Sequence, residues 1–394
     1  MSIPKVSIII PCYNTQKYLR ECLDSVVHQS LYNIQIICIN DGSTDATLSI
    51  LKEYARQDNR ILIIDKKNSG YGDSMNCGFD AAEGEYLGIV EPDDYAELDM
   101  FRQLYESAVK YNLDVCKAGF FEYSTTPEIR NTPVLSSVKL AGKNVFCPTR
   151  DFKSPQKQAA FFSAIPAIWA GIYRKSFIRD NHIWFNPTPG ASYQDVGFCF
   201  KVWSKAQRVL MLDCCLLHYR IDNPYSSVHS IGKAYCVSDE FAEIDRFLKV
   251  DSGLRERLHP VMIRSKYERY IWNYERLTGT VQAKFLDHFC EEFRQHQREG
   301  LLCKEYFSWY GWNNLQRLLL DPDRYHMIQS KKLVGEASED FYDAYPEHRP
   351  VKGKLAYYII ENMAGAIYYL NEEGIISTFN RLLIKIKRYF KLRK

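Results

Sequence analysis

Near the start of the sequence lies the stretch Val6-Ser7-Ile8-Ile9-Ile10-Pro11-Cys12-Tyr13-Asn14, an apolar run that ends in turn-forming residues. β-branched runs that are apolar on both faces are typical of strands buried in a parallel sheet. Similar runs follow at 34–39, 61–64 and 86–90. Apolar residues at helical spacing separate them, so the pattern predicts alternating strands and helices, which is an α/β fold with an open parallel sheet.

Polar residues follow each of the four predicted strands. In an open parallel sheet, ligands bind beyond the carboxyl ends of the strands. The residues at those ends are 11–14, 40–45, 68–72 and 91–95, and they include Asp41, Asp93 and Asp94. We therefore expect these tips to converge on a polar ligand, together with a cation.

Motifs that the sequence lacks narrow the choice of ligand. No G-x-G-x-x-G follows the first strand and no G-x-x-x-x-G-K-[ST] occurs, which argues against dinucleotide and P-loop sites. Acidic residues near a phosphate need a divalent metal between them. The chain has 51 Lys and Arg against 48 Asp and Glu, and this near-neutral balance argues against nucleic acid as a partner.

Each acidic motif also has a purely structural interpretation. Asp93-Asp94 after Pro92 could form a tight turn that precedes a helix. Asp41-Gly42-Ser43-Thr44-Asp45 could be a turn with a helix N-cap. The two motifs at neighbouring strand tips favour a functional site more strongly together than either does alone.

With these motifs in order, the sequence resembles the family 2 glycosyltransferases. The resemblance rests on 6–14, 40–45, 68–78 and 91–94, and it continues through Ile168-Trp169, Tyr173-Arg174-Lys175, 193–198, His218-Tyr219-Arg220 and Ser226-Ser227. It covers residues 4–230. It implies a GT-A type, Rossmann-like domain that binds a nucleotide sugar, followed here by a mainly helical C-terminal region.

The resemblance also implies roles for particular residues. Asp195 takes the place of the catalytic base, and Asp94 that of the principal metal ligand, with Mn²⁺ or Mg²⁺ as the cofactor. His218 is a second candidate metal ligand. The expected donor-binding residues are Pro11, Tyr13, Asn14, Asp41, Asn68, Gly70, Asp93, Arg220, Ser226 and Ser227.

Two positions depart from the family pattern. Glu91 stands where many members have the first Asp of the acidic run, so its own role stays open. Gln194 replaces the Glu that usually precedes the catalytic Asp, while Asp195 itself is retained. Removing a neighbouring carboxylate also removes a like charge that would raise the pKa of the base.

The implied activity is metal-dependent, inverting transfer of a hexosyl or N-acetylhexosaminyl group. A nucleoside-diphosphate sugar, expected to be UDP-linked, would be the donor. A hydroxyl of a glycan or lipid-linked molecule would be the acceptor, in the synthesis of a bacterial-type surface polysaccharide. Two alternatives stay open: a sugar nucleotidyltransferase, and a catalytically silent scaffold that binds sugar nucleotides.

The sequence divides into three predicted parts. Residues 1–232 form the catalytic domain and 233–345 a helical region in which an aromatic stripe, including Tyr267, Tyr270 and Tyr274, is interpreted as core. Residues 354–394 form an amphipathic segment whose last twenty residues carry seven basic and no acidic side chains. Two interpretations stay open: a helix packed on the protein core with its basic face in solvent, and an interfacial helix that would bind anionic lipid. The expected location is cytoplasmic, with free thiols, on the inner face of the cell membrane.

Overall fold

The computed structural model describes residues 3–142, 144–226 and 233–334. The amphipathic segment 354–394 and Ser227 therefore lie outside the described residues. The chain divides into two compact units, Met1–Arg269 and Tyr270–Lys394. The first unit thus extends past residue 232, where the sequence predicts the end of the catalytic domain.

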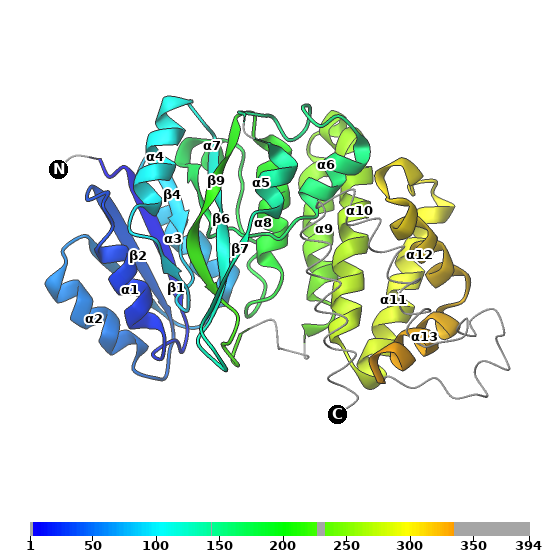
Figure 1. Ribbon diagram of the computed structural model, residues 1–394, viewed down its shortest axis with the longest axis horizontal. Coiled ribbons are helices and arrows are strands. Elements are labelled where there is room, and N and C mark those ends of the chain that lie inside the picture. The colour runs from blue at the N-terminus through cyan, green and yellow to red at the C-terminus, as the bar shows by residue number, and fades with distance from the viewer. Residues whose placement is uncertain (1–2, 143, 227–232, 335–394) are drawn as a thin grey trace. The chain divides into compact units, whose positions relative to one another are not determined.

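Nine strands of the described residues form one mixed sheet in the first unit (Figure 1). Their order is β3-β2-β1-β4-β8-β6-β9-β5, with β7 paired to β6. The strands are β1 (Val6–Cys12), β2 (Ile34–Asp41), β3 (Ile61–Lys66), β4 (Tyr86–Ile89), β5 (Tyr95–Ala96), β6 (Val115–Ser124), β7 (Arg130–Val134), β8 (Gly171–Arg174) and β9 (Val209–Arg220).

The first four strands run parallel, as the apolar runs predict. β1 lies between β2 and β4, with Ile8 opposite Ile36 and Gly88, and every residue of β1 is buried. β8 then pairs antiparallel to β4, so the sheet changes from parallel to mixed at this strand. The α/β fold with its parallel half is confirmed.

Helices connect the parallel strands and cover the sheet. In the first unit they are α1 (Leu19–Val27), α2 (Thr47–Gln57), α3 (Tyr71–Ala81), α4 (Met100–Lys110), α5 (Ser136–Ala141), α6 (Pro155–Phe162), α7 (Lys175–Asp180), α8 (Gln194–Lys205) and α9 (Cys236–Lys249). α3 packs on β1 and β2, and its buried residues Met75 and Phe79 face them. α10 (Ser252–Arg276) begins in this unit and ends in the second.

The second unit is helical where it is described. It contains the end of α10 together with α11 (Gly279–Arg298), the 3₁₀ turn η3 (Lys304–Tyr306), α12 (Trp309–Leu320) and α13 (Pro322–Val334). Tyr270 and Tyr274 are almost fully buried, which agrees with their interpretation as core. Tyr270 packs against Phe285 and Phe289 of α11. None of the helices in the described ranges is long and apolar enough to cross a lipid bilayer.

Candidate active site

The loops after β1 and β2 hold each other in place. Asn14, in a left-handed conformation with φ of 52°, accepts the N–H of Thr44 at 2.8 Å and donates its own N–H to Ser43 Oγ at 3.0 Å. Asp45 Oδ2 accepts the N–H of Gln16 at 3.1 Å. The residues that follow Asp41 therefore shape the first strand tip, in addition to opening α2.

Pro11 and Tyr13 stand on either side of the end of β1. Pro11 is buried in the sheet opposite Ile39, whereas Tyr13 is 51% exposed at the rim. An exposed aromatic ring at this edge can face a planar base.

Asp41 organises the loop after β3. Its Oδ1 accepts the N–H of Ser69 at 2.9 Å and a charged bond from Lys66, while its Oδ2 accepts the N–H of Gly70 at 3.0 Å. Asn68 donates its side-chain amide to the carbonyl of Asp41 at 3.0 Å. Three of the predicted donor-binding residues, Asp41, Asn68 and Gly70, are thus brought together.

Gly70 is the residue that this loop requires. Its φ is 97°, a backbone conformation that residues other than glycine rarely adopt. A Cβ at this position would also lie 2.8 Å from the backbone of Thr188 and Gly190. The loop after β3 therefore packs directly against the segment that leads into α8.

Asp93 and Asp94 form the turn after β4. Asp94 is 1% exposed, and its Oδ1 accepts the backbone N–H of Arg220 at 2.8 Å. Its Oδ2 is buried and has no hydrogen-bond partner among the described residues. Burial, reinforced by the charge of Asp93, raises the pKa of Asp94 well above its usual value. Asp93 in turn accepts the side-chain amide of Asn223 at 2.8 Å.

The unpartnered oxygen of Asp94 fits a cation. A buried carboxylate oxygen without a donor is costly unless a positive charge or a proton lies against it. No group of three His, Cys, Asp or Glu side chains placed to hold a metal occurs in the ranges that the structure describes. Mg²⁺-type ions are commonly held by one or two carboxylates together with substrate phosphates, so Asp93 and Asp94 suffice for that arrangement.

Arg220 holds this turn through its side chain. Its Nε donates to the carbonyl of Asp93 at 3.0 Å, and its other nitrogens bond Glu21 and Asp222. The guanidinium also packs 4.5 Å from the centre of the Tyr18 ring. With a side chain only 3% exposed, Arg220 is engaged by the protein itself, and the structure does not present its guanidinium to a diphosphate.

His218 lies opposite Tyr95, the residue that follows Asp94, where β5 pairs with β9. Its Nε2 lies 2.7 Å from Glu97 Oε1 and its Nδ1 lies 2.9 Å from Asn131 Oδ1. The ring stacks on Tyr95 at 4.1 Å and on Phe121 at 4.8 Å. Both ring nitrogens are therefore occupied, and we leave His218 out of the metal set proposed below.

Asp195 lies in the first turn of α8, and its Oδ1 accepts the N–H of Val196 at 2.9 Å. Burial raises the pKa of Asp195, and the positive charge of Arg269 opposes that rise. Burial also raises the pKa of Glu91 to about 8, with contributions from the charges of Asp93 and Asp195. The charges of Asp195, the predicted base, and of Asp93 in the turn therefore both raise the pKa of the same carboxyl, that of Glu91.

Gln194 has a structural role. Its amide donates to Thr188 Oγ1 at 2.9 Å and to the carbonyl of Gly190 at 3.1 Å, while its oxygen accepts the N–H of Ser192. A glutamate here could not make the two donated bonds. The departure from the family pattern therefore fixes the loop ahead of Asp195.

Two residues near the site carry no recognisable signal in the sequence. Tyr71 donates its hydroxyl to Glu91 Oε1 at 2.5 Å. Arg269 on α10 donates to the carbonyls of Ser163 and Ala164, at 2.8 and 2.5 Å. Arg269 looks in the sequence like one more charge on an aromatic helix, and only the fold places it near Asp195.

The segment after β9 closes the described part of the site. Asn223 accepts the N–H of Ser226 through its carbonyl at 3.2 Å, and Asp222 accepts the backbone and hydroxyl groups of Thr125 and Thr126. The described residues are interrupted after Ser226 and resume at residue 233, so the predicted role of Ser227 lies outside them.

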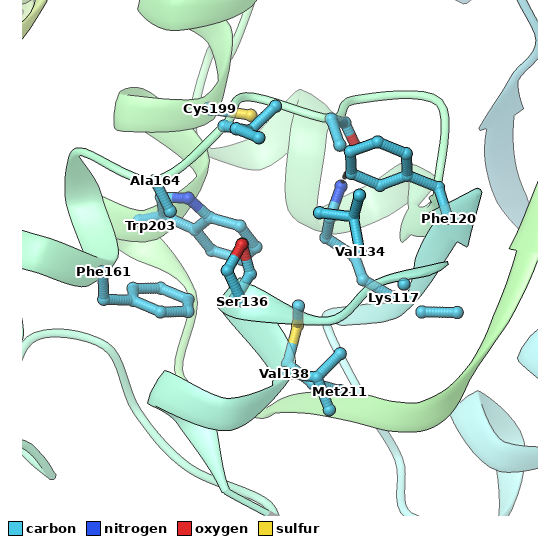
Figure 2. Close-up of a pocket in the computed structure, with 15 residues that line it drawn as sticks. Lys117, Phe120, Val134, Ser136, Val138, Phe161, Ala164, Cys199, Trp203 and Met211 are labelled. Atoms are coloured by element: carbon cyan, nitrogen blue, oxygen red, sulfur yellow. Dashed lines mark hydrogen bonds between the residues drawn. The ribbon is translucent and has the colours of Figure 1, made fainter. Parts of the chain in front are cut away.

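A small cavity lies beside the sheet, and no carboxylate lines it (Figure 2). Its volume of about 20 Å³ has room for one water molecule. Lys117 lines it and donates to the carbonyl of Ala167 and to Tyr173, and burial lowers the pKa of Lys117 to about 8. The cavity is too small for a sugar nucleotide and belongs to the core.

The mixed sheet and the Asp93-Asp94 turn at its edge are those of an α/β protein of the GT-A class. Residues 7–169 match the model of glycosyl transferase family 2, so this part of the chain carries a glycosyltransferase domain.

Curated relatives agree with this assignment. The chain is 34% identical over 224 residues to the uncharacterized glycosyltransferase EpsJ of Bacillus subtilis, covering 57% of this chain and 63% of the relative. It is 32% identical to the putative glycosyltransferase EpsH of the same organism, covering 56% and 62%. The chain therefore spans less than two thirds of the length of these relatives.

A solved structure shares the fold over most of the chain. S. aureus TarS 1-349 in complex with UDP-GlcNAc superimposes with a TM-score of 0.65 at 17% identity, covering 85% of this chain and 93% of that one. This similarity establishes the GT-A fold together with its helical continuation.

Proposed function

We propose that the protein transfers a sugar from a UDP-linked donor to a hydroxyl of a glycan or lipid-linked acceptor during polysaccharide synthesis, with inversion at the anomeric carbon. The observation that carries the proposal is the unpartnered buried oxygen of Asp94; Asp195, which is half-buried, acts on Glu91 together with Asp93. The UDP-GlcNAc bound by TarS supports the choice of donor, and the glycosyltransferases EpsJ and EpsH support the choice of reaction.

The reaction needs charge stabilisation on one side of the anomeric carbon and proton removal on the other. When bound at Asp94, with Asp93 beside it, Mn²⁺ or Mg²⁺ supplies a Lewis acid that offsets the negative charge growing on the leaving diphosphate. Asp195 accepts the proton of the acceptor hydroxyl as its oxygen attacks. One bond forms from that oxygen to the anomeric carbon while the bond to the phosphate oxygen breaks, which inverts the centre.

The surroundings of Asp195 suit a general base. A base works best when its pKa approaches the working pH, and burial moves the pKa of Asp195 in that direction. The positive charge of Arg269 opposes this rise in the pKa of Asp195.

The alternatives fit the site less well. A sugar nucleotidyltransferase needs a basic, glycine-rich phosphate loop after β1, whereas residues 14–16 are held by Ser43, Asp45 and Thr47. A silent scaffold would have no use for both an unpartnered Asp94 oxygen and the half-buried carboxylate of Asp195.

A screen tests the proposal directly. The full chain is heated with each of a panel of UDP- and GDP-sugars, with Mn²⁺, Mg²⁺ or EDTA, and donor hydrolysis is measured in parallel. We expect a UDP-sugar to raise the melting temperature and to be hydrolysed slowly, in both cases only with the metal. If no sugar nucleotide does either with any metal, the proposal is wrong.

A peripheral membrane location is also proposed, from the sequence of 354–394 alone. An enzyme that extends a lipid-linked acceptor gains from sharing the surface on which that acceptor lies. The basic residues of this segment would meet anionic lipid while its apolar face enters the interface.

A further inference from the structure

Tyr219 lies between two residues of β9 that face the other way. Successive side chains of a strand point to opposite faces of the sheet. His218 and Arg220 share the face that holds Tyr123. The ring centres of His218 and Tyr123 are 6.0 Å apart, and the guanidinium carbon of Arg220 lies 4.9 Å from the centre of the Tyr123 ring. Tyr219 points to the opposite face, where it stacks on Trp169 with ring centres 4.9 Å apart and an angle of 9°.

Packing fixes the orientation of the Tyr219 ring. Trp169 is 7% exposed, so the indole is a core side chain, and Phe120 meets both Trp169 and Tyr219 edge-on. A tyrosine held by two aromatic neighbours has few accessible rotamers, so its hydroxyl is directed before any ligand arrives. The ring itself is only partly buried.

The hydroxyl of Tyr219 lies among the acidic groups of the site. The charges that act on it are, in decreasing order, those of Asp94, Asp93, Asp195 and Glu91. Burial and these charges raise the pKa of Tyr219, so the phenol keeps its proton. The hydroxyl makes no hydrogen bond within the described residues, which leaves it a donor without an acceptor.

We propose that the hydroxyl of Tyr219 donates a hydrogen bond to the sugar that is transferred, from a ring that the buried Trp169 holds in place. The inference rests on the proposed function. The anomeric carbon must lie between the leaving oxygen, on the Asp94 side, and the acceptor hydroxyl, on the Asp195 side. Tyr219 is within the influence of both groups, so the pyranose is the part of the donor that it meets.

Tyr219→Phe removes the hydroxyl and keeps the ring on Trp169. We expect the Kd for the nucleotide sugar, and the KM for the same donor, to rise about tenfold, because one neutral hydrogen bond is lost. The Kd for the matching nucleoside diphosphate should not change, because it lacks the sugar. Tyr105→Phe is the control, since Tyr105 of α4 donates its hydroxyl to Glu85 in an exposed hydrogen bond.

The measurement is isothermal calorimetry with Mn²⁺, on the full chain. The titrants are UDP-GlcNAc, UDP-glucose, UDP-galactose and GDP-mannose, each beside its own diphosphate, and melting temperatures are recorded. Equal weakening of sugar nucleotide and diphosphate would mean that Tyr219 serves the diphosphate, and unchanged binding of both would mean that it contacts no substrate. Either result overturns the inference. A wild-type chain that binds none of the titrants would instead refute the proposed function.

Discussion

The backbone N–H of Arg220 donates a 2.8 Å hydrogen bond to Oδ1 of Asp94, and the side chain of the same arginine bonds the carbonyl of Asp93. The last residue of β9 thus fixes the turn that follows β4. This bond occupies one oxygen of Asp94 and leaves the other available.

Asp94→Asn should weaken metal-dependent donor binding. The substitution removes a charged oxygen ligand from a hard cation, so we expect the Kd for the UDP-sugar with Mn²⁺ to rise by at least about tenfold. Calorimetry with and without EDTA measures it. Asp80→Asn is a suitable control, because Asp80 is an exposed residue of α3. Donor binding that keeps its full metal dependence in Asp94→Asn would contradict the assignment.

Asp195→Asn should separate binding from chemistry. The amide cannot take a proton, so kcat should fall by about 10²–10⁴-fold while the donor Kd changes little. In the wild type, Asp195 must be ionised, so kcat/KM should rise with pH through the pKa of this carboxyl, which burial holds above its ordinary value. A stopped transfer assay across pH 4–8 checks both statements. Normal turnover in the variant would exclude Asp195 as the base.

Arg269→Met should move the acidic limb of that pH profile upward. Arg269 lowers the pKa of Asp195, so removing the cation lets the pKa rise, and a higher pH is then needed to ionise the base. Arg269→Lys keeps the charge and should restore most of the original profile. A variant that melts earlier but keeps the wild-type profile would show that Arg269 only supports the carbonyls of Ser163 and Ala164.

Arg220→Met should destabilise the first unit. The change leaves Asp222 and the carbonyl of Asp93 without their buried cation, which costs about 3 kcal/mol of unfolding free energy. Chemical denaturation followed by circular dichroism measures the loss. Arg20→Met is the matched control, because Arg20 pairs with Glu53 at the surface. If Arg220→Met keeps its stability and loses only donor affinity, the guanidinium contacts the diphosphate after all.

Removing residues 374–394 should abolish binding to anionic liposomes. Each Lys or Arg near an anionic surface contributes about 1 kcal/mol, and seven are lost. Co-sedimentation at low and high salt measures the effect, and activity on a soluble acceptor should survive. A full-length chain that ignores anionic liposomes at low salt would rule out this anchor.

The parts of the site that could be predicted are those that depend on residues close together in the sequence. The strand tips with Asp41 and Asp94 follow from apolar runs of fixed period and from turn residues, and both signals act within a few residues. Because parallel strands end on the same edge, the predicted parallel sheet alone brings the loops after β1, β2 and β3 to one edge.

What could not be predicted depends on partners far away in the chain. The sequence shows that Arg220 could bind a phosphate and that His218 could bind a metal. It does not show that Arg220 pairs with Glu21, or that His218 pairs with Glu97. The role of Gln194 depends on the carbonyl and amide groups of one particular loop. Such contacts arise only when the backbone is folded, because they join residues without any shared period or motif.

The location of Arg269 bears on how the catalytic part of this protein can be isolated. The family match ends at residue 169 and the motifs end near 230, yet the cation that acts on Asp195 is on α10. A recombinant fragment that ends near residue 230 would keep these motifs and still lack the positive charge that acts on Asp195. A minimal catalytic fragment must therefore run at least through Arg269, where the first compact unit ends.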